Sequence, residues 1–302
     1  MRHRTLRGVA SEPVDIGPVG LDHIETFAEG LDHPEGITIT PGGRIYVGGE
    51  AGQIYRIEDD DTATEVANTG GFILGIAADA DGRIYAADTV HRCVWRVTPD
   101  DGTHTVYAVG LPERPFSVPN WGAFDADGNL YLTDSGGWGA ASGLIWRILP
   151  GGASTVWTEA AVDFPNGCAV APDGACLYYV ESLPGRICRI DIASDGSAGE
   201  RTVLCELGLV VPDGVAITDD GGLVISCYRP DVIYRWHQDE GLSLIASDPR
   251  GTTLAAPTNV VFAGEDRSLL VVPNLGRWHL SRGRFGLRGV PLHYPTGDQL
   301  GG

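Results

Sequence analysis

The chain lacks the long apolar segments and basic surfaces that mark membrane proteins and nucleic-acid-binding proteins. Its 302 residues contain no run of about eighteen or more apolar residues, so we expect no membrane-spanning helix. The first residues are basic but lead into no continuous apolar core, so we expect no secretory signal. The formal charge is −19, and no basic patch is long enough to follow a phosphate backbone, which argues against nucleic acid as a partner. Acidity of this kind favours solubility and attracts divalent cations.

Cysteine is scarce, and its spacing fits neither a zinc site nor a redox motif. The six cysteines form no C-x-x-C pair and have no histidine nearby at zinc-ligand spacing. Most of them lie inside apolar runs, where a free thiol behaves as a small buried hydrophobe. Together with the missing secretory signal, this pattern predicts reduced thiols and a cytoplasmic protein.

Glycine and proline are abundant, and they punctuate an internal repeat. The 43 glycines and 19 prolines favour many short strands joined by tight turns. Similar units begin near residues 34, 73, 119, 165, 212 and 257, at spacings of about 39 to 47 residues, which is typical of propeller blades. Each unit alternates strands with turns, often of the D-G or G-G type. We therefore predict an all-β fold, a six-bladed β-propeller with four antiparallel strands per blade.

The two ends of the chain are expected to complete this ring. Residues 25–31 precede the first inner strand without a unit before them, whereas the sixth unit lacks a clear fourth strand. We therefore predict that the N-terminal strand closes the last blade. Residues 1–20 are interpreted as an N-terminal extension and residues 21–302 as a single propeller domain. The tail after Arg284 is expected to pack over the outside of the ring.

The repeat carries polar residues at one equivalent position, the start of each inner strand. In a propeller such positions surround one mouth of the central channel, so their oxygen atoms converge there. Carboxylate and amide oxygens are ligands that Ca²⁺ prefers, and the absence of His and Cys argues against zinc. Asn and Asp before glycine can also be ordinary turn residues, although an apolar residue in the second unit shows that the turn does not demand a polar one. The six positions hold Glu35, Leu74, Asn120, Asn166, Asp213 and Asn259.

These residues at the starts of the inner strands, which we call the tips, lie in short motifs that resemble those of a known family. Pro-Glu-Gly at 34–36, Pro-Asn at 119–120, Phe-Pro-Asn-Gly at 164–167 and Pro-Asp-Gly at 212–214 are similar to elements of the SMP-30/gluconolactonase/LRE family of calcium-dependent lactonases. The resemblance covers about residues 30–284 and extends to the diisopropyl-fluorophosphatase and paraoxonase propellers. It implies that Glu35, Asn166 and Asp213 bind the catalytic Ca²⁺, for which Zn²⁺, Mg²⁺ or Mn²⁺ could substitute. Asn120 would be a fourth metal ligand or a substrate contact.

The chain departs from the gluconolactonase pattern beside the third tip. Members of that branch carry an arginine two residues before the asparagine, where it holds sugar hydroxyls or a carboxylate. Here that position is Val118, and Asn120 is followed by Trp121 instead of Asp. Sugar-acid lactones are therefore disfavoured, and the nearby Phe116, Trp121 and Trp138 indicate a more apolar pocket.

The resemblance also implies a mechanism and a wider set of residues. The metal would act as a Lewis acid, and Asp213 would be the general base for an attacking water or, alternatively, the nucleophile. Acids that end the second strands, among them Asp88, could hold substrate, orient ligands or simply cap strand ends. The predicted substrate-binding residues are Asn120, Trp121, Asp134, Trp138, Glu181, Asn259 and His33.

The leading functional hypothesis is a calcium-dependent hydrolase that opens a lactone or related ester of a small molecule. One alternative is a propeller of this fold recruited for a biosynthetic condensation or isomerisation, as in strictosidine synthase, which uses no metal. Another is a non-catalytic NHL-like binding propeller, because residues 75–97 resemble an NHL repeat. A binding module has no need for carboxylates and amides converging on an axis. The substrate and the oligomeric state stay open.

Overall fold

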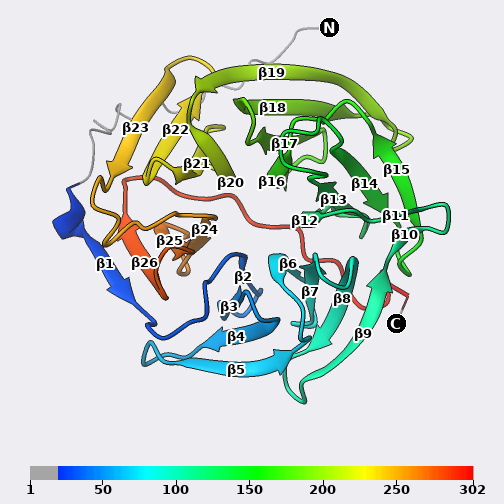
Figure 1. Ribbon diagram of the computed structural model, residues 1–302, viewed down its shortest axis with the longest axis horizontal. Helices are drawn as coiled ribbons and strands as arrows, with labels where there is room; N and C mark the ends of the chain where they lie inside the picture. The colour runs from blue at the N-terminus through cyan, green and yellow to red at the C-terminus, as the bar shows by residue number, and fades with distance from the viewer. Residues whose placement is uncertain (1–19, 302) are drawn as a thin grey trace, which may run out of the picture.

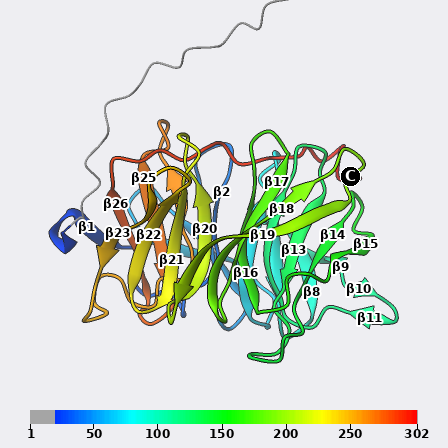
Figure 2. The same ribbon diagram turned by 90° about the horizontal axis from the view of Figure 1, so that it is seen from above.

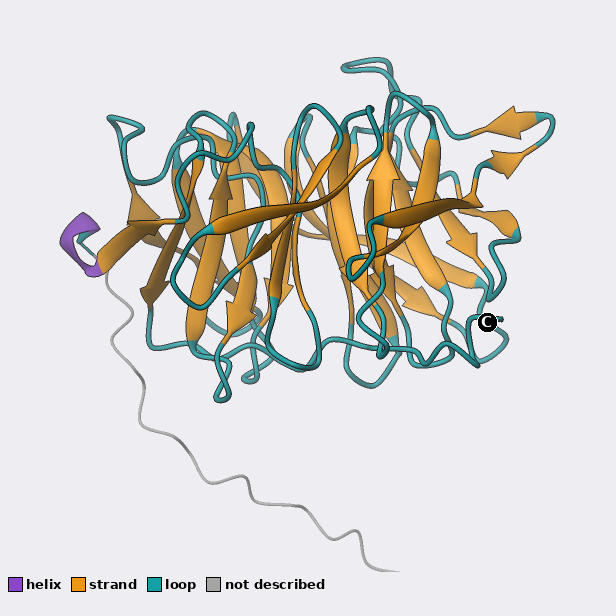
Figure 3. Cartoon of the chain, turned by 90° about the horizontal axis from the view of Figure 1, so that it is seen from below, coloured by secondary structure: helices purple, strands orange, loops and turns teal. Residues whose placement is uncertain are grey.

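The fold is a ring of six small sheets in a computed structural model that describes residues 20–301. Each sheet has four antiparallel strands, and the sheets stand around a central axis as propeller blades (Figure 1). Strands and loops dominate the ring, and a short 3₁₀ helix, η1 (Leu21–His23), precedes it (Figure 3). The predicted six-bladed propeller is confirmed. The extension predicted for residues 1–20 lies, apart from Gly20, outside the described residues.

Strands follow one another outward from the axis in sequence order within blades one to five. The first three blades comprise β2 (Ile37–Ile39), β3 (Ile45–Gly48), β4 (Gln53–Ile57) and β5 (Ala63–Asn68), then β6 (Ile73–Ala78), β7 (Ile84–Asp88), β8 (Cys93–Thr98) and β9 (Thr103–Ala108), then β12 (Pro119–Phe124), β13 (Leu130–Asp134), β14 (Leu144–Ile148) and β15 (Ser154–Thr158). A two-stranded hairpin, β10 (Gly110–Leu111) with β11 (Arg114–Pro115), joins blades two and three.

The remaining blades keep the same arrangement, except that the last one takes its outer strand from the N-terminal region. They comprise β16 (Pro165–Val170), β17 (Cys176–Glu181), β18 (Gly185–Ile192) and β19 (Ala198–Gly208), then β20 (Val211–Ile217), β21 (Leu223–Arg229), β22 (Val232–His237) and β23 (Gly241–Ser247), then β24 (Val261–Ala263), β25 (Leu269–Asn274), β26 (His279–Arg284) and β1 (Ile24–Phe27). Within residues 20–301, no helix is both long and apolar enough to cross a membrane.

Ring closure by the N-terminal strand is confirmed. β1 pairs antiparallel with β26, with Ile24 opposite Gly283 and Phe27 opposite Leu280. The guanidinium of Arg282, in β26, pairs with Glu25 of β1 at 2.9 Å and with Asp61 of blade one at 2.7 Å. This bridge ties the last blade to the first at the point where the chain itself does not connect them.

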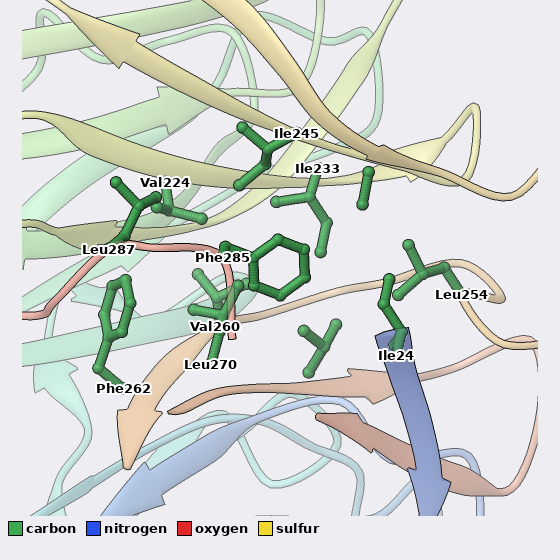
Figure 4. Packing of buried hydrophobic residues seen from close by; sticks show 12 residues of the cluster. Ile24, Val224, Ile233, Ile245, Leu254, Val260, Phe262, Leu270, Phe285 and Leu287 are labelled. Atoms are coloured by element: carbon green, nitrogen blue, oxygen red, sulfur yellow. The ribbon is translucent and has the colours of Figure 1, made fainter. Parts of the chain in front are cut away.

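Apolar side chains from neighbouring blades fill the space between the sheets. In one cluster, Val224 and Ile233 of blade five pack with Leu270 of blade six and with Phe285 and Leu287 of the C-terminal segment (Figure 4). Burial of side chains of this size stabilises a fold by about 1.5–3 kcal/mol each. Because blades meet face to face, this packing also fixes where each inner strand begins.

The C-terminal segment crosses one end of the ring, so the expectation that it packs over the outside is wrong (Figures 1 and 2). We call residues 285–300 the C-terminal clasp, because it hydrogen-bonds to all six blades near the ends of their inner strands. The segment takes this route because its apolar residues cover the end of an apolar channel. A cavity of about 90 Å³ lies beneath them. The bonds, from blade one to blade six, are Tyr294 Oη to Ile39 O (2.8 Å), Ala80 N to Pro295 O (2.9 Å), Gln299 Nε2 to Ala126 O (3.1 Å), His293 Nε2 with Ala171 O (3.0 Å), Val290 N to Ile217 O (3.1 Å) and Gly289 N to Arg267 O (2.8 Å).

We predict that the clasp contributes substantially to stability through its last buried residue. Leu300 is 1% exposed and packs with Phe124 and Trp146, so Leu300→Ala should lower the free energy of unfolding by about 2–4 kcal/mol. Leu292→Ala is the matched control, because Leu292 lies in the same segment but is 42% exposed. Urea denaturation of both variants measures the difference, and equal losses would contradict the proposed role of the clasp.

Candidate metal centre

The predicted tip residues lie together at the end of the ring opposite the C-terminal clasp. They stand at or just before the start of the inner strands, whereas the clasp contacts the other ends of those strands. The polar tips are all buried, at no more than 8% exposure; they are Glu35, Asn120, Asn166, Asp213 and Asn259. The structure therefore brings polar groups from five blades to one mouth, as the repeat predicts.

Glycines beside the tips allow neighbouring inner strands to approach closely. A Cβ atom on any of these glycines would lie 2.3–2.6 Å from backbone atoms of the next tip, closer than Cβ atoms come in proteins; the pairs are Gly36 with Leu74, Gly75 with Asn120, Gly167 with Asp213, and Gly214 with Asn259. Asn166 and Gly167 lie within β16, and Asp213 and Gly214 lie within β20. These residues are therefore strand residues at blade contacts, which excludes the turn interpretation for them.

Two serines that the sequence did not single out orient the tip amides. The Nδ2 atom of Asn120 donates to Ser135 Oγ at 2.9 Å, and that of Asn166 donates to Ser182 Oγ at 3.3 Å. Each serine in turn donates to a backbone carbonyl of the next blade, Ser135 to Pro165 (2.7 Å) and Ser182 to Pro212 (2.8 Å). Because the amide nitrogens are held this way, each amide keeps its oxygen as an acceptor.

The one signal that could have identified these serines is their position. Ser135 and Ser182 directly follow Asp134 and Glu181, the acids that end the second strands of blades three and four. The tips of blades three and four are Asn120 and Asn166, the two amides that these serines contact. In these two blades, a serine one step beyond the acid therefore marks an oriented amide.

The two carboxyl groups at the mouth have strongly raised pKa values. Burial raises the pKa of Asp213 to about 8, against a smaller lowering effect of its hydrogen bond with Asn166. The pKa of Glu35 is raised well above its usual value by burial, by the nearby charge of Asp213 and, less strongly, by Glu50. The Oε2 atom of Glu35 is buried without a hydrogen-bond partner. A cation at this place would remove the repulsion and satisfy the orphaned oxygen.

The donor set fits a hard divalent cation. Within residues 20–301, no three His, Cys, Asp or Glu side chains gather in a manner that could hold a metal ion. The mouth offers instead two carboxylates and the amide oxygens of Asn120 and Asn166. Oxygen donors with two negative charges suit Ca²⁺, which takes six to eight oxygens and readily accepts water or substrate among them.

Other predicted substrate-binding residues differ in how they face the mouth. Asn259 Oδ1 accepts a bond from Val260 N at 2.9 Å, so this amide is partly engaged by its own backbone. Trp121 is buried and lines the channel cavity, whereas Trp138 is 60% exposed and packs edge-to-face on Phe164 at 4.8 Å. Only the buried tryptophan therefore lies in the channel, and the second lies on a surface loop.

The acids that end the second strands form structural hydrogen bonds. Asp134 accepts from Ser117 N (2.8 Å), Val118 N (2.7 Å) and Trp146 Nε1 (3.1 Å), and so fixes the loop that leads into Asn120. Asp88 accepts from the backbone of Val90 and His91 and from the Trp95 indole in the same manner. These contacts position loops, and substrate contact by Asp134 stays a prediction.

Glu181 and His33 are likewise held by neighbours. Glu181 is fully buried and pairs with Arg201 at 2.5 Å and with Arg186 at 3.4 Å. His33 Nε2 accepts from Trp278 Nε1 at 3.2 Å, so its Nδ1 carries the proton and donates to Asp32 at 2.9 Å. With both ring nitrogens engaged, His33 is poorly placed to accept a proton from water.

Comparison with known proteins identifies the family. The chain matches the family described as SMP-30/Gluconolactonase/LRE-like region over residues 33–274, and it belongs to this family. A gluconolactonase of Zymomonas mobilis is 29% identical over 201 residues, which cover 58% of this chain and 54% of the relative. Protein strictosidine synthase-like 3 of Arabidopsis thaliana is 25% identical over 171 residues, 52% of this chain and 43% of the relative. The chain thus spans about half the length of the curated relatives it matches.

Solved structures share the same propeller. A gluconolactonase from Xanthomonas campestris has a TM-score of 0.74 at 19% identity, covering 88% of this chain and 89% of that chain. Regucalcin from Agrobacterium tumefaciens, a calcium-binding protein, has a TM-score of 0.70 at 18% identity, covering 89% and 97%. At these identities the likeness establishes the fold alone.

We predict that the metal-stripped protein loses stability as the pH rises from about 4 to about 8 because of Asp213. Its pKa is about 8 in the folded protein against 3.8 ordinarily, so in this window the folded state holds a proton that the unfolded state has released. Asp213→Asn removes this contribution, and its melting temperature should fall less with pH than that of the wild type. Asp219→Asn, an exposed acid at the clasp end, is the control. Parallel melting curves for wild type and Asp213→Asn would refute the assignment.

Proposed function

We propose that this protein is a lactonase that depends on a divalent cation, with Ca²⁺ the best fit. The observation that carries the proposal is the pair of buried carboxylates, Glu35 and Asp213, with an oxygen of Glu35 left without a partner. The gluconolactonase relatives favour a lactone substrate, and the calcium-binding neighbour favours calcium. In this proposal Glu35, Asn120, Asn166 and Asp213 hold the cation. When bound, the ion would supply Lewis-acid polarisation of the substrate carbonyl.

Asp213 is the residue we assign as general base. Its carboxylate is buried at the mouth among the residues that would hold the cation, where it can accept the proton of an attacking water. Water adds to the carbonyl carbon, its proton passes to Asp213, and the bond to the ring oxygen breaks. The proton then returns to the leaving alkoxide, so that the products are a carboxylate, a hydroxyl group and a released proton. A direct nucleophilic role for Asp213 is the alternative within the same site.

The residues around the tips limit the range of possible substrates. Val118 stands half-buried two residues before Asn120, and Trp121 directly follows Asn120, so no charged side chain flanks this tip directly. We therefore propose a small lactone or related ester other than a sugar-acid lactone. We also propose a cytoplasmic location, which the six free and mostly buried cysteines favour.

A panel of lactones and esters, assayed with calcium and with chelator, tests the proposal. Hydrolysis that depends on calcium supports it. Activity that chelator leaves unchanged would instead favour the metal-free biosynthetic class to which the strictosidine-synthase-like relative points. Binding without any turnover across the panel would favour a non-catalytic propeller.

We predict that Asp213→Asn and Glu35→Gln each reduce kcat/KM on the best lactone by about 100-fold or more, because each removes a charge that the reaction and the cation require. Both variants keep the shape of the side chain, so circular dichroism should show an unchanged fold. Calorimetric titration with Ca²⁺ should show weaker binding in both. Asp219→Asn serves as the charge-matched control, and full activity in both tip variants would overturn the site assignment.

A further inference from the structure

A polar groove of about 880 Å³ lies beside the metal mouth. Its walls are four loops at the tip end of the ring: residues 229–231 between β21 and β22, 249–256 between blades five and six, 276–279 between β25 and β26, and 29–33 between β1 and β2. The C-terminal clasp covers the other end of the channel, so a substrate reaches the tips from the side on which this groove opens.

Three exposed arginines line the groove, and two of them have no acidic partner. Arg229 is paired with Asp231 at 3.0 Å. By contrast, Arg250 and Arg277 form no ion pair with the described carboxylates, and Arg277 Nε donates only to the Gly251 carbonyl at 3.3 Å. What distinguishes these two arginines is their place in a groove, in a chain that has 40 acidic residues against 21 basic ones, all of them arginine. Unpaired guanidinium groups in a groove are a ready site for an anion, because the planar fork binds carboxylate or phosphate through two parallel bonds.

One wall of the groove continues along the chain to the tips. Ala256 N donates to Asp231, and Ala255 N donates to Asn274 Oδ1 at 2.8 Å, so this stretch of loop is fixed in place. Three residues further on is Asn259, and the preceding Thr258 donates from Oγ1 to the Glu35 carbonyl at 2.9 Å. The arginines and the tips are therefore parts of one connected surface.

We propose that Arg250 and Arg277 bind an anionic group of the substrate, a carboxylate or phosphate, while the reacting carbonyl lies at the tips. This inference rests on the proposed lactonase function and specifies its substrate class as lactones that carry a negative charge. Glu29 and Asp231 also line the groove. They limit its positive charge and confine the anion to the two arginines without acidic partners.

The first arm of the test measures anion binding and needs no catalysis. Metal-stripped protein, freed of chelator, is titrated with inorganic phosphate and separately with succinate at constant ionic strength. Wild-type protein should bind one or both probes, and Arg250→Ala/Arg277→Ala should bind about tenfold more weakly. Arg44→Ala/Arg288→Ala is the matched control, because it removes two exposed arginines at the opposite end of the ring. Preference for phosphate or for succinate distinguishes the two sources of anion.

The second arm measures specificity with γ-butyrolactone and its 3-carboxylate derivative, in the presence of calcium. The double groove variant should raise KM for the carboxylated lactone about tenfold with little change in kcat, and leave the neutral lactone unaffected. Absence of probe binding to wild type, or equal binding by wild type and the groove variant, overturns the inference even if lactones are hydrolysed. Probe binding that the groove variant loses, in a protein that hydrolyses no lactone, supports the anion site and overturns the proposed function instead.

Discussion

The candidate site of this protein depends on two buried carboxylates at one mouth of the ring. Glu35 and Asp213 come from blades one and five. Burial of their charges, and for Glu35 also the nearby charge of Asp213, costs free energy in the absence of a cation. Folding tolerates this cost because the rest of the ring fixes both residues. Glycines bring the inner strands into contact, and Ser135 and Ser182 hold the amides of Asn120 and Asn166. The strain is thus localised at the place where a cation would relieve it.

The rigidity of the mouth depends on closure at both ends of the chain. β1 completes the last blade, and Arg282 links that blade to blade one through Asp61. The clasp adds a second closure, because it hydrogen-bonds to every blade on the face away from the tips. Opening the ring at either junction would let the tips separate, and binding sites of this kind require positions held to within a fraction of an ångström.

The blades and tips could be predicted from the sequence because both belong to the repeat. Residues at the same position of the six units must lie at equivalent places around the axis, all at one end of the ring. Glu35, Asn166 and Asp213 could therefore be predicted without knowledge of the packing. Features outside the repeat could not be found this way. The path of the clasp depends on which apolar surface its residues cover, and the partners of Ser135, Ser182 and Arg277 are distant in sequence or in another blade. A residue that recurs in every repeat unit shows where it lies in the fold. A contact that is made only once produces no repeating pattern in the sequence.

The net charge of −19 does not oppose an anionic substrate at this site. At physiological ionic strength the screening length is about 8 Å, so charges on the far blades are largely screened at the mouth. The charges that remain effective are local: the arginines of the groove, the two tip carboxylates and any cation that they hold. A cation at the tips would offset the two carboxylates, and Arg250 and Arg277 would then give the entrance a positive character. Cation binding at the tips and anion binding in the groove should therefore reinforce each other, since each reduces the electrostatic cost of the other.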